Sequence, residues 1–253
     1  MTGTLIEFSW ATLACAALIV TLAYVVYGLT GFGASIVAIP LLVHFFALRF
    51  AVPLMLVFDL FAGLLLVLRN RRHLSRPELL RLLPYLALGM IGGVTLLIRV
   101  PERWLLLGLG TFVVAYATWS LLNRAATVPA SARWAVPAGL IGGAFTALYG
   151  TGGPIYTIYL ARRLFDKNVL RATIGVLIFC TALIRLALFT ASGLYTQQGL
   201  LTLAIALIPF ALVGYLVGST LHARMATRQA VRVVWCLLVL SGASLALRAL
   251  AMR

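Results

Sequence analysis

Long stretches without a charged side chain dominate this sequence. One runs from residue 8 to residue 48, and others cover 104–123 and 134–161. Only 10% of the 253 residues are charged, whereas an ordinary soluble domain is about 25% charged. A bilayer core takes roughly 20 apolar residues per helix, and helices satisfy their own backbone polar groups in lipid. The sequence therefore predicts an all-α polytopic membrane protein.

About eight hydrophobic helices are expected, and no polar gap is long enough for a separate soluble domain. Residues 1–253 are thus predicted to form a single transmembrane domain. The hydrophobic segments are 8–28 with a tail to 48, 50–68, 80–98, 104–122, 134–161, 172–191, 198–221 and 231–248.

The net charge of +15 comes from 20 Lys and Arg against five acidic residues. Because the arginines gather at segment ends, they are interpreted as anchors that fix helices in the bilayer, and no nucleic-acid partner is expected. The three cysteines lie apart within apolar segments and are expected to be free thiols. No Walker, HExxH or GxSxG motif is present, so no catalytic residue, metal or cofactor is predicted, and the protein is not expected to be an enzyme.

Two glycine-rich interruptions fall inside apolar segments, "YGLTGFGASIVAIP" at 27–40 and "YGTGGP" at 149–154. Inside a helix, Gly costs about 1 kcal/mol and Pro about 3 kcal/mol relative to Ala. Unwound backbone at membrane depth survives only where it is buried in protein or lines a polar cavity. The pattern predicts glycine-broken or re-entrant helices near 28–35 and 150–154.

Two segments of the sequence are similar to each other. "LGMIGGVTLLIRVPER" at 88–103 matches "VGYLVGSTLHARMATR" at 213–228, and the breaks pair at a similar offset. Internal repeats are therefore expected at roughly 8–123 and 133–250. The matched positions, all 125 residues apart, are Gly89, Gly93, Thr95, Arg99 and Arg103 with Gly214, Gly218, Thr220, Arg224 and Arg228.

Charge in the loops predicts that these repeats are inverted. The loop at 69–81 holds five arginines, whereas its counterpart at 193–197 holds no Lys or Arg. By the positive-inside rule these loops face opposite sides of the membrane. That arrangement arises if 134–161 folds as a broken element and does not cross once, as discontinuous helices of secondary transporters do.

The breaks are the predicted substrate site. Helices that restart near Ala34 and Pro154 would point free N–H groups and a positive dipole end at a cavity, which favours a small anion. The alternative is that these glycines only permit tight helix crossings. The predicted substrate-binding residues at the breaks are Thr30, Gly31, Gly33, Ala34, Ser35, Gly150, Thr151, Gly152, Gly153 and Pro154.

Two charges, Asp59 and Arg185, lie near the middle of apolar segments. A charge there costs at least about 2.5–3.5 kcal/mol on insertion scales, so it needs a reason. We expect the two side chains to approach each other, or Arg185 to bind the substrate anion while Asp59 couples protons. A static ion pair that fixes helix packing is the alternative.

The paired breaks identify a resemblance. "GLTGFGASIVAIP" and "GAFTALYGTGGPIYTIYL", one near the start of each half, resemble the sulfite exporter TauE/SafE family over essentially the whole chain. Both copies depart from the family's fuller glycine run, which is often G-x-G-G-G. The resemblance implies a bacterial inner-membrane transporter that exports small sulfur-containing or related organic anions.

The predicted function is a secondary transporter in the bacterial inner membrane that exports a small anion, such as sulfite or an organosulfur or organic acid. Its expected partners are the lipid bilayer, the anionic substrate and coupled protons. A passive anion channel is the alternative, which would share the breaks without needing Asp59. A non-transporting integral membrane scaffold is a further alternative, but it leaves the duplicated breaks unexplained.

Overall fold

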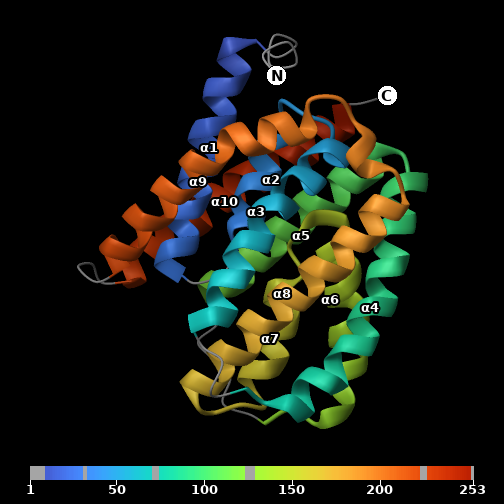
Figure 1. Cartoon of the computed structure of the whole chain (residues 1–253), viewed down its shortest axis with the longest axis vertical. Helices are drawn as coiled ribbons and strands as arrows, with labels where there is room; N and C mark the ends of the chain where they lie inside the picture. The colour runs from blue at the N-terminus through green and yellow to red at the C-terminus, as the bar shows by residue number, and fades with distance from the viewer. Residues whose placement is uncertain (1–8, 31–32, 70–73, 123–128, 223–226, 252–253) are drawn as a thin grey trace. The chain divides into compact units, whose positions relative to one another are not determined.

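A computed structural model describes residues 9–30, 33–69, 74–122, 129–222 and 227–251. Within these ranges every regular element is helical (Figure 1). The α-helices are α1 (Trp10–Thr30), α2 (Ala34–Leu42), α3 (Leu48–Arg69), α4 (Arg76–Arg99), α5 (Glu102–Leu122), α6 (Ala135–Tyr149), α7 (Gly153–Ala161), α8 (Lys167–Ala191), α9 (Leu200–His222) and α10 (Thr227–Ala251), with 3-10 turns η1 (Ala132–Trp134) and η2 (Leu194–Thr196).

The predicted polytopic all-helical class is confirmed. Four described helical stretches are long and apolar enough to cross a membrane: Trp10–Leu29, Arg76–Arg99, Asn168–Ala191 and Leu200–Leu221. A shorter apolar stretch covers Leu238–Ala251 in α10.

Both predicted interruptions are present. The first apolar segment divides into α1, which ends at Thr30, and α2, which begins at Ala34. The segment 134–161 divides into α6, which ends at Tyr149, and α7, which begins at Gly153. Each short helix after a break has nine residues, which is about half the length needed to span a bilayer.

The helices form two compact units. Unit 1 comprises Met1–Met55, Val100–Arg124 and Tyr195–Arg253, and unit 2 comprises Leu56–Arg99 and Ala125–Leu194. Each unit therefore draws helices from both predicted repeats, and each contains one of the two breaks.

In unit 1, α1 packs closely along α9 because two glycines of α9 leave room for carbonyl groups of α1. A Cβ atom at Gly214 would collide with the carbonyl oxygen of Thr21, and one at Gly218 would collide with that of Val25. These contacts confirm that the small residues of α9 serve helix packing.

In unit 2, α4 and α6 lie side by side and make the corresponding contact (Figure 1). A Cβ atom at Gly89 would collide with the carbonyl oxygen of Leu140, and one at Gly93 would lie 2.5 Å from that of Ala144. The glycines lie 125 positions before their counterparts in α9, and the carbonyls lie 119 positions after theirs in α1. This correspondence supports the predicted repeats. The repeats and their inversion both stay predictions.

The candidate site of unit 2 is positioned by five helices. The α6–α7 pair carries the second break, α4 packs along α6, and α8 contacts α4, α6 and α7. The part of α3 that belongs to unit 2 supplies a carboxylate to the same region.

Candidate functional site

The second break is a tight reversal of backbone direction at the end of α6. Gly150 has φ 63°, in the left-handed region that residues with a Cβ rarely adopt. Its N–H donates to the carbonyl oxygen of Thr146 at 2.9 Å, and the N–H of Thr151 donates to that of Phe145 at 3.4 Å. These bonds satisfy carbonyl groups at the end of α6 that a helix otherwise leaves without partners.

The next two glycines have different surroundings. A Cβ atom at Gly152 would collide with the hydroxyl of Thr146 and the carbonyl oxygen of Gly142, whereas the nearest atom to one at Gly153 is the Tyr156 hydroxyl at 3.6 Å. The Thr146 hydroxyl itself donates to the Gly142 carbonyl at 2.6 Å. Gly152 is thus required for close approach of the backbone, and Gly153 is not.

A buried ion pair lies beside this break. Arg185 of α8 has a side chain only 3% exposed, and its Nη2 donates to Oδ2 of Asp59 in α3 at 2.7 Å. The Asp59 side chain is 15% exposed. The predicted approach of the two charges is therefore confirmed as a contact.

Arg185 also joins the pair to the break. Its Nη1 donates to the carbonyl oxygen of Thr146 at 3.2 Å, one turn before Gly150. A cation at this place is stabilised by the negative end of the α6 dipole as well as by Asp59. Tyr156 of α7, which is 2% exposed, lies near enough to interact electrostatically with both charges.

Two buried donors at this site have no hydrogen-bond partner among the described residues. They are Nε of Arg185 and the hydroxyl of Thr151, whose residue is 1% exposed. A buried polar group that lacks a partner costs about 1–3 kcal/mol. Both groups are donors, so an anion or another acceptor that bound here would satisfy them.

The first break lies in unit 1 and has different chemistry. Gly33 has φ 93° and precedes α2, and the next two residues, Ala34 and Ser35, are both buried. Gly31 lies outside the described residues, and Thr30 is the last residue of α1, with its side chain outside the description.

The charged pair has no charged counterpart in the matching half of the sequence. Alignment of residues 69–80 with residues 190–201 gives a local offset of 121 between the halves, at which Asp59 corresponds to Cys180 and Arg185 corresponds to Leu64. The two breaks are therefore chemically unequal, and the second is the one where Arg185 donates to a backbone carbonyl, that of Thr146.

A second polar cluster, which the sequence reasoning missed, ties the far end of α7 to the start of α4. Glu78, only 5% exposed, accepts from the Tyr159 hydroxyl at 2.6 Å and from Nη2 of Arg163 at 2.8 Å. Nη1 of Arg81 donates to the same carboxylate at 2.7 Å. Hydrogen bonding and charge attraction to Glu78 raise the pKa of Arg163, which lies just after α7. The signal in the sequence was an acidic residue with an arginine three positions later, which we interpreted only as part of a basic loop.

No group of three or more His, Cys, Asp or Glu side chains that could hold a metal ion occurs in the described ranges. Cys15 and Cys180, two of the predicted free thiols, are free in the structure.

Comparison with known proteins gives two matches. A family model described as "Sulfite exporter TauE/SafE" matches residues 16–245. The chain is also 26% identical over 193 residues to "Probable inner membrane transporter protein TsaS" of Comamonas testosteroni, an alignment that covers 76% of this chain and 81% of that protein. No solved structure gives a significant match.

Proposed function

We propose that this chain, which belongs to the sulfite exporter TauE/SafE family, is a secondary transporter that exports a small anion. Its family and its relative make it a multi-pass inner-membrane transporter and not an enzyme. The anion binds at the second break, where Arg185 supplies the charge. The single observation that carries this proposal is a guanidinium 3% exposed beside unwound backbone, with one N–H that no described residue accepts. A charge at membrane depth is expected to serve substrate or ion movement.

Asp59 acts in this proposal as the internal counter-ion that the substrate replaces. Its carboxylate accepts from Arg185 at 2.7 Å. A proton on Asp59 removes that negative charge and frees the guanidinium for an anion. Anion binding is then linked to proton uptake, so the anion and the proton move in the same direction. Export by this coupling requires an outward anion gradient larger than an opposing inward proton gradient.

The substrate class follows from the donors. Arginine presents N–H groups in a planar fork that fits carboxylate and other oxyanions, and the Thr151 hydroxyl adds a further donor. Sulfite, organosulfonates and short carboxylates all present oxygen atoms of this kind, so the site favours a small oxyanion. Thr30, Gly31, Gly33, Ala34 and Ser35 of the first break remain proposed as substrate-contacting residues.

Thermal unfolding of the purified protein against an anion panel tests the proposal. The panel contains sulfite, sulfate, thiosulfate, sulfoacetate, taurine and simple carboxylates. A ligand at 100 times its dissociation constant adds about 2.7 kcal/mol to the free energy of unfolding. We expect at least one anion to raise the unfolding temperature of the wild type and to have no effect on the double variant Asp59→Asn/Arg185→Gln, which removes both charges together. If that variant responds to the anion as the wild type does, the anion does not bind at Arg185.

Transport in proteoliposomes separates the proposal from a passive channel. A secondary transporter moves the anion against its own gradient when a pH gradient is imposed, whereas a channel only dissipates the anion gradient. If an imposed pH gradient never drives the anion above its equilibrium concentration inside the liposomes, the result would favour the channel.

A further inference from the structure

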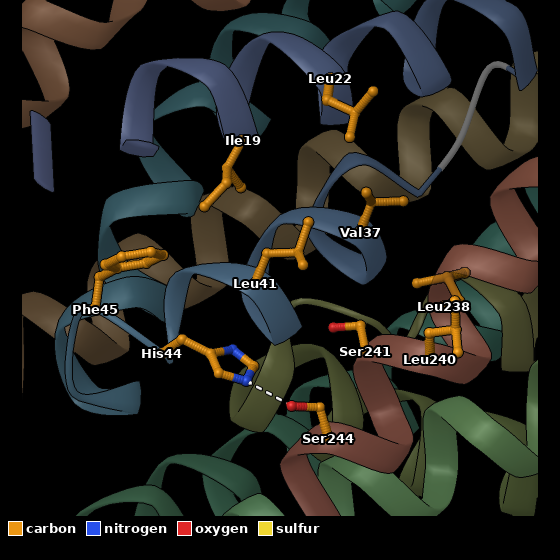
Figure 2. A pocket seen from close by; sticks show the side chains of 10 residues that line it. All are labelled: Ile19, Leu22, Val37, Leu41, His44, Phe45, Leu238, Leu240, Ser241 and Ser244. Atoms are coloured by element: carbon orange, nitrogen blue, oxygen red, sulfur yellow. Dashed lines mark hydrogen bonds between the residues drawn. The ribbon is translucent and has the colours of Figure 1, made fainter. Parts of the chain in front are cut away.

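A groove of about 470 Å³ opens on unit 1 between α1, α2 and α10, and neither Asp59 nor Arg185 is among its lining residues. Its lining is almost entirely apolar, as Figure 2 shows. Leu22, Phe45 and Leu240 on its walls are 39%, 48% and 68% exposed, so the groove reaches the surface of the unit. In a membrane protein such a surface meets lipid chains.

The lining changes from apolar to polar in the same direction along two elements. Along α2 and the turn that follows it, Val37 and Leu41 are succeeded by His44, at helical spacing. Along α10, Leu238 is succeeded by Ser241 and then Ser244. The groove therefore has an apolar end and a polar end, which match the two ends of an amphiphilic ligand.

The polar ends of the two elements are joined to each other. Nε2 of His44 lies 3.1 Å from the Ser244 hydroxyl (Figure 2). Arg248, one turn further along α10, donates from Nη1 to the carbonyl oxygen of Val43 at 2.6 Å. Arg248 lies in the last turn of α10, which is where a basic side chain meets lipid headgroups at the edge of a bilayer.

One buried hydroxyl between the two ends lacks a partner. Ser241 is 8% exposed and lines the groove, and its Oγ has no hydrogen-bond partner among the described residues. Figure 2 shows its side chain on the same side of the groove as Ser244, opposite Ile19 and Leu22. A buried serine normally bonds to the backbone of its own helix or to a neighbour. Its hydroxyl is thus available to an acceptor that enters the groove.

We propose that this groove binds one acyl chain of an anionic phospholipid. The chain lies against Val37, Leu41 and Leu238, an ester carbonyl oxygen accepts from Ser241, and the phosphate lies near His44 and Arg248. At about 470 Å³ the groove lies within the roughly 300–1,000 Å³ that is typical of ligand pockets. The net charge of +15 and the guanidinium at the polar end favour an anionic headgroup over a zwitterionic one.

Native mass spectrometry of the detergent-purified protein tests this proposal, with phosphatidylglycerol and phosphatidylcholine as the added probes. The variant Leu41→Trp fills the groove, and Leu216→Trp, at a residue 60% exposed on α9 and outside the groove, is its matched control. We expect the wild type and the control to retain phosphatidylglycerol and Leu41→Trp to lose it. Equal retention by all three proteins would overturn the proposal.

Two further variants test the polar end without adding volume. Arg248→Gln is expected to weaken phosphatidylglycerol binding about fivefold and to leave phosphatidylcholine binding nearly unchanged. Ser241→Ala is expected to weaken both lipids alike, about twofold to tenfold, because both carry the ester carbonyl. If neither variant changes the binding of either lipid, the headgroup does not lie at this end. If Leu41→Trp instead abolishes self-association and leaves lipid retention unchanged, the groove belongs to a second copy of the chain and the proposal is wrong.

Discussion

The Asp59–Arg185 pair makes an asymmetric prediction for single and double substitutions. Asp59→Asn leaves a guanidinium that is 3% exposed and still donates to the Thr146 carbonyl but has lost its counter-ion, so it is expected to cost about 3–5 kcal/mol of unfolding free energy. Arg185→Gln leaves a carboxylate that is 15% exposed and able to take up a proton, so about 1–3 kcal/mol is expected. A guanidinium cannot release its proton in the same way.

The double variant shows whether the two charges stabilise each other in the folded protein. Asp59→Asn/Arg185→Gln is expected to lie within about 1 kcal/mol of the wild type, which gives a coupling energy of at least about 2 kcal/mol. Unfolding in mixed micelles with increasing SDS measures all four proteins, and Arg171→Gln, at an exposed residue of the same helix, is a control expected to change stability by less than about 0.5 kcal/mol. Additive single effects would refute this reasoning.

Three other predictions rest on contacts in unit 2, each measured as the midpoint of SDS unfolding. Gly152→Ala is expected to destabilise by about 1–3 kcal/mol because its Cβ overlaps backbone and hydroxyl oxygens, whereas Gly153→Ala has room and should be neutral or stabilising; equal effects would contradict the described geometry. Gly89→Ala should destabilise by a similar amount at the crossing with α6, while Gly92→Ala meets nothing within 4 Å and should stabilise by about 0.5–1 kcal/mol; a harmless Gly89→Ala would show that the helices do not approach so closely. Glu78→Gln should cost about 1–3 kcal/mol, since it weakens charge-assisted bonds to arginines that are partly exposed, and unchanged stability would mean that this cluster does not hold α7.

The sequence was sufficient to predict the breaks because their physics is local. Glycines at 150, 152 and 153 interrupt an apolar segment, and a helix in lipid cannot be interrupted without a reason. The sequence did not reveal which glycine adopts the left-handed conformation. That position is Gly150 because its N–H must reach back to Thr146 to close the end of α6.

Longer-range features were harder to predict, because they depend on how helices pack. Asp59 and Arg185 were predicted to meet because each is costly alone and because the repeat alignment puts them at similar depths in equivalent helices, both of which can be read from the sequence. Glu78 was missed because nothing near it in the sequence indicates that Tyr159 of α7 and Arg163 just after α7 bind it. The groove of unit 1 was also missed, since its lining combines α1 and α2 with α10, which lies near the other end of the sequence, and includes His44, for which we predicted no site.

The central claim is that an anion at Arg185 is exchanged for the carboxylate of Asp59 and therefore moves with a proton. The most direct test is anion flux in proteoliposomes over a range of pH, with and without an imposed pH gradient, for the wild type and Asp59→Asn. The account predicts that the pH gradient drives uphill anion movement in the wild type and that Asp59→Asn carries out only downhill movement with no dependence on pH. Uphill, pH-dependent transport by folded Asp59→Asn at the wild-type level would contradict it.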